Sequence, residues 1–244
     1  MRYKLLLEYD GSAFFGWQRQ KENISVQEVL ENALTVALRH AVALSVCGRT
    51  DTGVHATGQV AHFDTPTAVD CFRLTGSLNA LVRPHPVAVK EIVPVADTFD
   101  ARFSARQRTY VYKIQNTVYP PVLRAGRVAH VPWLLDEKKM HKTGQMLLGK
   151  HDFSTFRASG CQAKSPVKTL DELCVWREGE MVYVRVRARS FLYHQVRNMV
   201  GTLMLVGSGA WSEADFKRAF EACNRTQGGP TAPAEGLYFT EVLY

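Results

Sequence analysis

The sequence has few cysteines, and no two of them have the spacing of a metal or redox motif. The five cysteines of the 244 residues are dispersed, at Cys47, Cys71, Cys161, Cys174 and Cys223. This odd number argues against a disulfide framework and for free thiols in a reducing compartment. No uncharged apolar run is long enough for a membrane helix, and the opening MRYKLLLEYD is too acidic for a signal peptide. We therefore expect a soluble, cytoplasmic protein without a membrane segment.

Positive charge is abundant and unevenly distributed. Lysine and arginine number 30 against 23 acidic residues, which gives a formal net charge of +7. Residues 1–104 carry 10 basic and 11 acidic side chains, whereas residues 105–244 carry 20 and 12. The excess therefore belongs to the second half, which suggests a polyanionic partner for that half.

The first half has the pattern of alternating strands and helices. Residues 2–9 alternate between apolar and polar side chains as a half-buried strand does. Ser25 and Glu28 form a capping-box signature before a helical apolar face that extends to Leu38. The other predicted elements are strands at 42–47, 60–63 and 87–95 and a helix at 70–82. Their order, βαββαβ, is that of the ferredoxin-like arrangement.

The second half repeats this order with longer connections. We predict strands at 108–116, 167–177, 181–189 and 237–243, and helices at 136–148, 192–206 and 213–223. The expected fold class is therefore α+β, with two ferredoxin-like halves, 1–104 and 105–244, and mainly antiparallel sheets. Such a duplication would place a central active-site cleft between the two sheets.

The most unusual local sequence is GRTDTGVHATG, at residues 48–58. Its glycines and threonines favour a tight loop between two strands, which would bring Arg49, Asp51 and His55 together. Beside a guanidinium, Asp51 should be ionised and available as a nucleophile or base. The alternative is that Asp51 and Thr52 only cap a turn.

Two other chemistries can be considered for this loop. Asp51, Thr52 and Gly53 form the tripeptide of aspartic proteases, but those enzymes need two such carboxylates and consist almost wholly of strands. A metal site could use Cys47, His55 and His62, but these residues lack the short spacings of zinc ligands. Neither alternative explains the basic second half.

The segment GRTDTGVHATGQVAHF, at residues 48–63, resembles the signature of the tRNA pseudouridine synthase A family. Similar blocks follow the order of that family and span nearly the whole chain, at residues 9–20, 97–114, 149–158, 191–201 and 232–239. The resemblance implies an isomerase that converts uridines 38–40 of the tRNA anticodon stem-loop to pseudouridine. It also implies a homodimer that uses no cofactor and no metal.

The resemblance further implies roles for individual residues. Asp51 would be the catalytic residue, either by covalent addition or by removal of a ribose proton. Arg49 would contact the substrate, and Tyr110 would stack on a flipped uridine and take part in proton transfer. Arg197 would be a buried arginine that pairs with the catalytic carboxylate, and Leu237 would line the uracil pocket. From the pattern alone, Tyr110 and Leu237 are packing residues, and Arg197 can equally extend to solvent.

Candidates for contacts with RNA phosphates follow from charge rather than from a motif. If MVYVRVRAR is a strand, its period of two places Tyr183 and three arginines on one face, where they can contact phosphate or only solvent. The candidate phosphate contacts are Arg102, Arg106, Arg108, Arg185, Arg187 and Arg189. The competing function is a non-catalytic RNA-binding module or tRNA chaperone, which a ferredoxin-like sheet also suits.

Overall fold

The computed structural model describes residues 1–244, which divide into two compact units. Unit 1 comprises Met1–Arg106 and Tyr238–Tyr244, and unit 2 comprises Gln107–Leu237. Five α-helices and mainly antiparallel strands confirm the α+β class. None of the helices is long and apolar enough to span a membrane.

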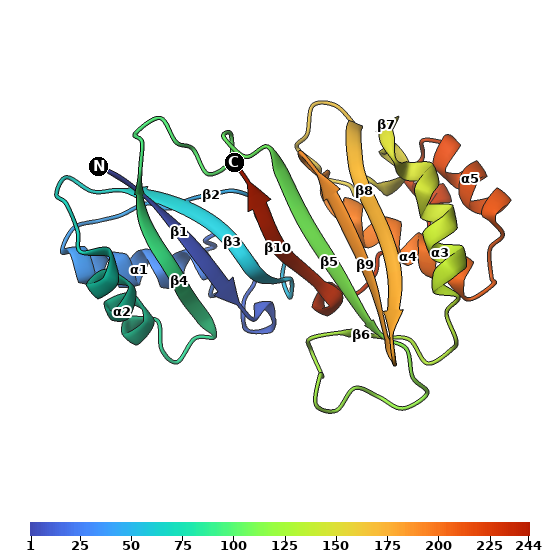
Figure 1. The fold of residues 1–244 in the computed structure, drawn as a ribbon, viewed down its shortest axis with the longest axis horizontal. Coiled ribbons are helices and arrows are strands. Elements are labelled where there is room, and N and C mark those ends of the chain that lie inside the picture. The colour runs from blue at the N-terminus through green and yellow to red at the C-terminus, as the bar shows by residue number, and fades with distance from the viewer. The chain divides into compact units, whose positions relative to one another are not determined.

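Unit 1 contains the predicted βαββαβ order. Its elements are β1 (Arg2–Tyr9), α1 (Val26–Leu38), β2 (Ser45–Val46), β3 (His55–Asp64), α2 (Cys71–Leu81) and β4 (Val87–Val95). Strand β1 pairs antiparallel with both β3 and β4, and α1 and α2 lie on one face of this sheet (Figure 1). Helix α1 begins as predicted, because the Ser25 side chain accepts a hydrogen bond from the backbone N–H of Glu28. Strand β3 begins earlier than the predicted strand at 60–63, and β2 is shorter than 42–47.

The last strand, β10 (Leu237–Leu243), has a partner that the sequence did not indicate. It pairs in parallel with β3, with Tyr238 opposite His55 and Phe239 opposite Ala56. Gly58 permits this approach, because a Cβ at that position would lie 2.0 Å from the carbonyl oxygen of Thr240. The apolar pattern predicts a strand here, but we assigned it to the second half, since a local pattern carries no information about its partner.

Unit 2 has strands that pair mainly antiparallel. Its elements are β5 (Gln107–Gln115), β6 (Ala129–His130), α3 (Glu137–Gly144), β7 (Gly149–Asp152), β8 (Val167–Glu178), β9 (Met181–Ala188), α4 (Gln195–Gly207) and α5 (Glu213–Glu221). Strand β9 lies between β5 and β8, β7 extends the sheet beyond β8, and β6 pairs in parallel with β5. The predicted helix at 136–148 ends at Gly144 and continues as a 3-10 turn, and the one at 192–206 begins only at Gln195. Short 3-10 helices are η1 (Gly11–Ala13), η2 (Gln145–Leu147), η3 (Ser154–Phe156), η4 (Arg225–Gln227) and η5 (Ala234–Gly236).

Each unit has its own buried core. In unit 1, Leu5 and Leu7 of β1 and Leu30 and Leu34 of α1 are fully buried. In unit 2, an aromatic cluster joins η3 to α5, with ring centroids of Phe156 and Phe216 6.1 Å apart and a fully buried Phe153 beside them. Both cores are apolar on the faces that the periodicity predicts.

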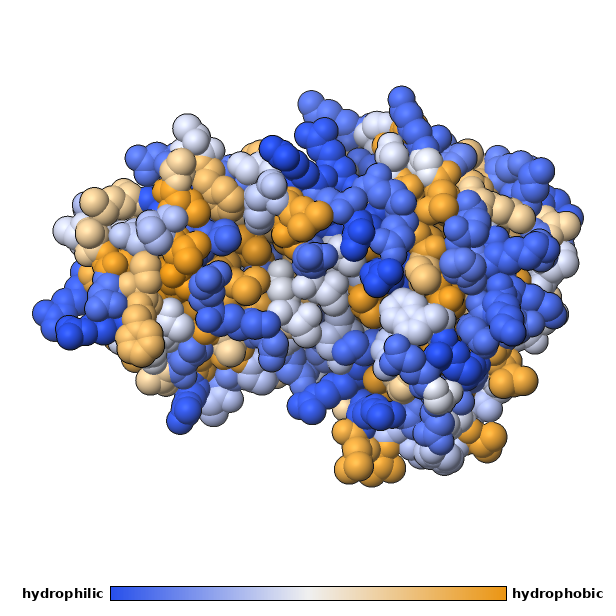
Figure 2. All heavy atoms as spheres, viewed as in Figure 1, coloured by the Kyte–Doolittle hydropathy of each residue, from blue (hydrophilic) through white to orange (hydrophobic).

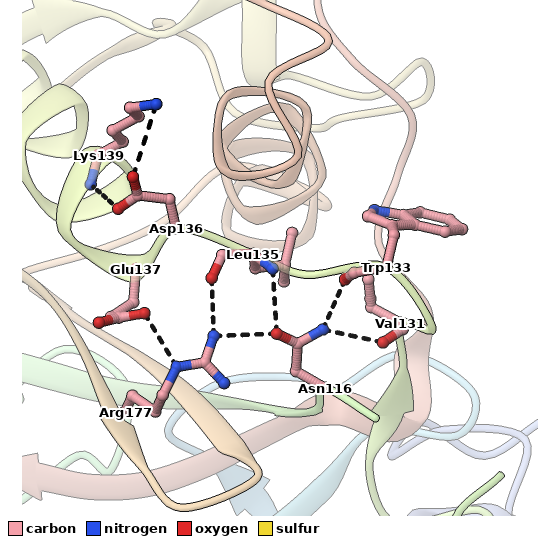
Figure 3. Close-up of polar contacts among 8 residues, drawn as sticks. All are labelled: Asn116, Val131, Trp133, Leu135, Asp136, Glu137, Lys139 and Arg177. Carbon is pink, nitrogen blue, oxygen red and sulfur yellow. Dashed lines mark hydrogen bonds and ion pairs between the residues drawn. The ribbon is translucent and has the colours of Figure 1, made fainter. Parts of the chain in front are cut away.

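A half-buried asparagine, Asn116, fixes the connection between β6 and α3 (Figure 3). The side-chain amide of Asn116 donates to the carbonyl oxygens of Val131 and Trp133, at 2.9 and 2.7 Å. Its oxygen accepts from Arg177 Nη2 at 2.9 Å, and Arg177 Nε donates to Glu137 Oε2 at 2.9 Å. The hydrogen bond from Arg177 lowers the pKa of Glu137. One amide and one guanidinium thus hold a connection that has little regular structure.

The long connection between β5 and β6 exposes large apolar side chains. Val118, Tyr119, Val122 and Leu123 are all exposed, and Leu123 is 96% accessible. Figure 2 shows hydrophobic residues at the tip of this loop, below a surface of unit 2 that is mostly hydrophilic. Contiguous apolar exposure of this kind is typical of surfaces that meet another molecule.

Candidate active site

The loop that carries Asp51 lies between β2 and β3 and ends in a tight turn. The backbone N–H of Val54 donates to the carbonyl oxygen of Asp51 at 3.1 Å, and Gly53 has a φ of +78°. A positive φ at the third position is the requirement of a type II turn, which glycine meets without strain. Asp51 is half-buried at the first position of this turn, whereas Arg49 is exposed.

Arg49 and Asp51 differ in exposure. Arg49 is exposed, the intervening Thr50 is buried, and Asp51 is half-buried. That Arg49 keeps Asp51 ionised stays a prediction. An exposed guanidinium beside the loop is available to contact a phosphate.

The segment after β1 supports the Asp51 loop through direct backbone contact. A Cβ at Gly11 would lie 2.1 Å from the carbonyl oxygen of Val54, so no side chain fits there. Gly16 has a φ of +85°, and a Cβ on it would lie 2.8 Å from the carbonyl oxygen of Thr50. The backbone N–H of Trp17 donates to that same oxygen at 3.0 Å. The backbone on both sides of Asp51 is thus held by the segment after β1, which approaches more closely than any residue but glycine allows.

A buried hydroxyl network lies beneath the same loop. The hydroxyls of Tyr9 and Thr50 are 2.7 Å apart, and the Gln59 amide donates to Tyr9 at 3.3 Å and to the carbonyl oxygen of Gly48 at 2.8 Å. Burial raises the pKa of Tyr9 to about 12, although its bonds to Thr50 and Gln59 act in the opposite direction. The Tyr9 hydroxyl is therefore protonated at neutral pH and fixes the loop as a neutral group.

Sequence reasoning missed this support. Tyr9 lies in the predicted strand at residues 2–9, and Gln59 directly precedes the predicted strand at 60–63, so the sequence assigned no role to either side chain. The signal that pointed to them was the block YDGSAFFGWQRQ, in which Gly11 and Gly16 stand among large aromatic residues. Two glycines in such a setting mark close backbone approach.

The histidines near the loop have structural partners. Nδ1 of His55 accepts a hydrogen bond from the backbone N–H of Gly11 at 3.0 Å, and its ring stacks on Tyr238 with centroids 4.6 Å apart. Nδ1 of His62 accepts from the backbone N–H of Ala101 at 3.1 Å, and burial lowers the pKa of this ring. No group of three or more histidine, cysteine or acidic residues has an arrangement suited to a metal ion.

In unit 2, Tyr110 and Tyr112 lie on the same face of β5 but differ in exposure. Tyr112 is fully buried, and its hydroxyl donates to the carbonyl oxygen of Pro233 at 2.7 Å. Gly236 makes room for this ring, since a Cβ there would lie 2.5 Å from Tyr112 Cζ. Tyr110 is only half-buried and meets Phe191 edge to face, with centroids 5.2 Å apart. Tyr112 is thus a packing residue, whereas Tyr110 keeps part of its ring accessible.

Arg197 and Leu237 belong to segments that are joined to each other. Arg197 lies in the first turn of α4, is half-buried, and donates from Nε to the carbonyl oxygen of Ala232 at 2.8 Å. The backbone N–H of Ala232 returns a bond to the carbonyl oxygen of Arg197 at 3.1 Å. Leu237, at the end of this segment, is 5% accessible. The two-way bond fixes the segment before Leu237 against α4.

Arg185 and Arg187 of β9 and Arg189, directly after it, alternate with buried residues as the strand pattern predicts, and Arg185 and Arg187 have an acidic partner. Arg185, Arg187 and Arg189 are accessible, whereas the intervening residues are buried. Glu172 of β8 accepts from Arg185 at 2.6 Å and from Arg187 at 3.1 Å. A single carboxylate thus offsets part of the charge of this face, which the sequence did not indicate because Glu172 lies on another strand.

The remaining arginine candidates differ in exposure. Arg102, Arg106 and Arg189 are exposed. Arg108 is buried, and its guanidinium donates to the carbonyl oxygen of Arg189. An arginine whose N–H groups donate to the backbone of its own sheet has fewer donors left for a phosphate than an exposed arginine.

Taken by itself, the Asp51 loop can present one carboxylate in a fixed position. A half-buried carboxylate on a rigid turn suits nucleophilic attack or proton removal, and neither step needs an external oxidant or reductant. The mixed fold with five helices differs from the nearly all-strand build of aspartic proteases.

Comparisons with known proteins give a consistent result. A family model described as tRNA pseudouridine synthase matches residues 6–104 and 144–244. The chain is 54% identical over 243 residues to tRNA pseudouridine synthase A of Rhodospirillum centenum, a match that covers 100% of this chain and 99% of that protein. It is 52% identical over 243 residues to the protein of the same name from Beijerinckia indica, with 100% and 94% coverage. The protein of that name from Rhodospirillum rubrum is 50% identical over 244 residues, with 100% and 88% coverage.

Proposed function

Because the chain belongs to the tRNA pseudouridine synthase family, we propose that it isomerises uridines of tRNA to pseudouridine with Asp51 as the catalytic carboxylate. In this reaction the bond between N1 of uracil and C1′ of ribose breaks, the base turns, and C5 bonds to C1′. The hydrogen of C5 leaves as a proton and N1 gains one, so nothing is oxidised or hydrolysed. A single positioned carboxylate is sufficient for this chemistry.

The observation that carries this proposal is the construction of the Asp51 turn. Backbone contacts at Gly11 and Gly16 and buried hydroxyls at Tyr9 and Thr50 surround the turn, all within the segment that matches the family model. Such close support is more than a surface turn requires, but it suits a reacting group whose position must be held closely.

The substrate uridine must leave its stack before a carboxylate can reach it. Flipping costs roughly a few kcal/mol, and stacking on an aromatic ring recovers about 1 to 3 kcal/mol. We assign this stacking to Tyr110, whose ring is partly accessible while its neighbour Tyr112 is buried. Tyr110 is also a candidate for proton transfer, and Leu237 for apolar contact with uracil.

The arginines divide into two proposed groups. Arg197 is assigned to act together with Asp51 in the reaction, and Arg49 to contact the substrate near the target nucleotide. Contact with the phosphates of the tRNA backbone is assigned to Arg102, Arg106, Arg108, Arg185, Arg187 and Arg189. The affinity for tRNA should then fall steeply with salt concentration. Arg189→Gln should reduce the slope of log affinity against log salt concentration by about one.

We propose the anticodon stem-loop, at uridines 38–40, as the site of modification, and the cytoplasm as the compartment. A homodimer is proposed from the family resemblance. The exposed apolar side chains between β5 and β6 are a surface suited to cover by a second subunit. Light scattering should give twice the chain mass of 27.4 kDa. A mass of one chain at working concentration would exclude the dimer.

The decisive experiment measures release of tritium from tRNA labelled at C5 of uridine. The native chain should release tritium, and Asp51→Asn should release none while binding tRNA with nearly the native Kd, because the two side chains have the same shape. Asp97→Asn, the same change at an exposed position, is the matched control and should turn over normally.

Three outcomes would contradict the proposal in different ways. Full turnover by Asp51→Asn would exclude the catalytic carboxylate. Binding of tRNA by the native chain without any tritium release would favour the alternative of a non-catalytic RNA-binding module. Mapping of the product to uridines outside 38–40 would correct the site of modification alone.

A further inference from the structure

Unit 2 contains a cavity of about 600 Å³ that none of the proposed roles uses. It lies where the chain after η3, the residues before α4 and the chain after η4 meet. Its lining includes Arg157, Ser159, Cys161, Arg225 and Thr231. Thr231 directly precedes Ala232, the residue that exchanges hydrogen bonds with Arg197. The chain that lines the cavity at Thr231 thus continues directly into a segment assigned to the reaction.

Two arginines of this cavity are fixed in position by neutral oxygens. Nη2 of Arg157 donates to the carbonyl oxygens of Cys161 and Ala163, both at 2.9 Å. Arg225 donates from Nη1 to the carbonyl oxygen of Gly229 at 3.0 Å, and from Nη2 to Asn198 Oδ1 at 3.2 Å. These bonds order both guanidinium groups without neutralising either of them.

Neither cation has a carboxylate partner, unlike Arg177, Arg185 and Arg187 of the same unit. Arg177 pairs with Glu137 at 2.9 Å, and Glu172 pairs with the arginines of β9. In the cavity, Arg157 uses only Nη2 for its two bonds to carbonyl oxygens and also interacts with the Cys161 thiol, and Nε of Arg225 donates to no acceptor of the protein. Donors that are fixed in place but unused lose little entropy when an anion binds.

The thiol of Cys161 reports the electrostatic character of the cavity. Burial alone would raise the pKa of this thiol, but hydrogen bonds from the backbone N–H groups of Tyr193 and Ala163, together with Arg157, lower it overall. The bond from Tyr193 reaches Sγ at 3.4 Å. The surroundings thus stabilise negative charge at this position.

We propose that this cavity binds a phosphate group of the tRNA backbone. This inference rests on the proposed function, and it adds a contact outside the β9 arginine face. The guanidinium fork matches phosphate oxygens, and the exposed Ser159 supplies a hydroxyl at the same cavity. The cavity lies in the half of the chain that carries the whole positive excess, so a polyanion is drawn toward it.

The first test places a carboxylate at the rim without disturbing the arginines that hold the backbone. Ser159 is exposed and lines the cavity, so Ser159→Glu should raise the Kd for tRNA about tenfold at 0.1 M salt and lower the salt slope by about one. Gln162→Glu makes the same charge change at an exposed residue nearby that does not line the cavity. It should retain nearly the native Kd and slope.

The second test uses Cys161 as a probe of occupancy. Mass spectrometry measures the rate at which iodoacetamide alkylates each thiol. Saturating tRNA should slow the alkylation of Cys161 at least fivefold and should leave that of Cys223 unaffected. Cys223 is exposed and does not line the cavity. Inorganic phosphate at millimolar concentration should protect Cys161 far less than tRNA, since it lacks the other contacts of the polymer.

The outcomes separate this inference from the proposed function. Native Kd in Ser159→Glu, or unprotected Cys161 in the tRNA complex, would overturn the phosphate site even if the chain forms pseudouridine. Protection by inorganic phosphate but not by tRNA would identify a small-anion site and would also overturn the inference. Protection by tRNA together with weakened binding by Ser159→Glu would support the site, even if tritium release were absent and the proposed function failed.

Discussion

The Asp51 loop of unit 1 and the arginine face of unit 2 are held in opposite ways. The loop is fixed by backbone contacts at two glycines and by buried hydroxyls, whereas the arginines stand on an accessible sheet face and are held by Glu172. A reacting carboxylate must be placed within a fraction of an ångström, but a phosphate contact tolerates more movement. Changes in the loop should therefore lower kcat, and changes on the face should alter Kd.

The strongest test of this division is Gly16→Ala. A methyl group there would lie 2.8 Å from the carbonyl oxygen of Thr50, at a backbone φ of +85° that alanine disfavours. We expect kcat for tritium release to fall about 100-fold, the effect of a displacement of about 1 Å, while the tRNA Kd changes little. Single-turnover kinetics and filter binding measure the two quantities.

Gly76→Ala is the matched control. Gly76 lies in α2 with no atom within 4 Å of its added Cβ, so this change should raise the free energy of unfolding by about 0.5 to 1 kcal/mol and leave kcat unchanged. Native kcat in Gly16→Ala would show that the backbone contact does not position Asp51.

Tyr9→Phe should have the next largest effect. It removes the hydroxyl shared by Thr50 and Gln59 and leaves buried polar groups without a partner, at a cost of about 1 to 3 kcal/mol in unfolding free energy. We expect kcat to fall about tenfold, since the loop loses one of several restraints. The same change at Tyr3, whose hydroxyl accepts from the backbone N–H of Val69 at 3.1 Å, should lower stability alone. Equal kcat losses in both variants would point to general destabilisation.

On the arginine face, Glu172→Gln should tighten tRNA binding. Removing the carboxylate takes a negative charge from beside Arg185 and Arg187, so we expect the Kd to fall about 3- to 10-fold and the salt slope to steepen by about one, with kcat unchanged. Glu221→Gln, on α5, makes the same charge change beside Lys217 and should leave binding near native. Identical salt slopes in the two variants would remove the β9 arginines from the tRNA-binding surface.

The smallest effect concerns an arginine of unit 2 that serves stability rather than binding. Arg177 lowers the pKa of Glu137 below its usual 4.5, so the pair stabilises the fold above that pH and the contribution is lost as the pH falls through the lowered value. Glu137→Gln should cost about 1 kcal/mol or less at pH 7, since both side chains are partly accessible.

Urea unfolding at several pH values measures the Glu137 effect. The difference between the native chain and Glu137→Gln should be full at pH 7 and should shrink only below 4.5. Glu213→Gln, which removes a more exposed pair with Lys142, should change stability less. A difference that grew toward acid pH would contradict the assigned direction.

Elements with strong local signals were predicted well. The helix at 26–38 and the strand at 87–95 have the predicted bounds, because a cap and a regular apolar period are properties of adjacent residues. The strand at 60–63 was predicted too short, since residues 55–59 include glycine and threonine and become a strand only through pairing with β1. Propensity is a weak guide where pairing supplies the stability.

The candidate site was predicted in part. The glycine-rich motif directed attention to Asp51, and the resemblance added Tyr110, Arg197 and Leu237. The paired state of Arg185 and Arg187 was not predictable, because their carboxylate stands on another strand. Nor was the unpaired state of Arg157 and Arg225, since a guanidinium is recognised as uncompensated only when every neighbouring acceptor is known.

The order of residues alone determined the alternation of β9, the start of α1 and the presence of a constrained turn around Asp51, because each depends on neighbours within a few positions. Tertiary structure decided which backbone passes beside that turn, which strand receives β10 and which arginines keep an uncompensated charge. These properties depend on contacts between residues far apart in the chain. The free energy of such contacts depends on distances that no local sequence pattern specifies.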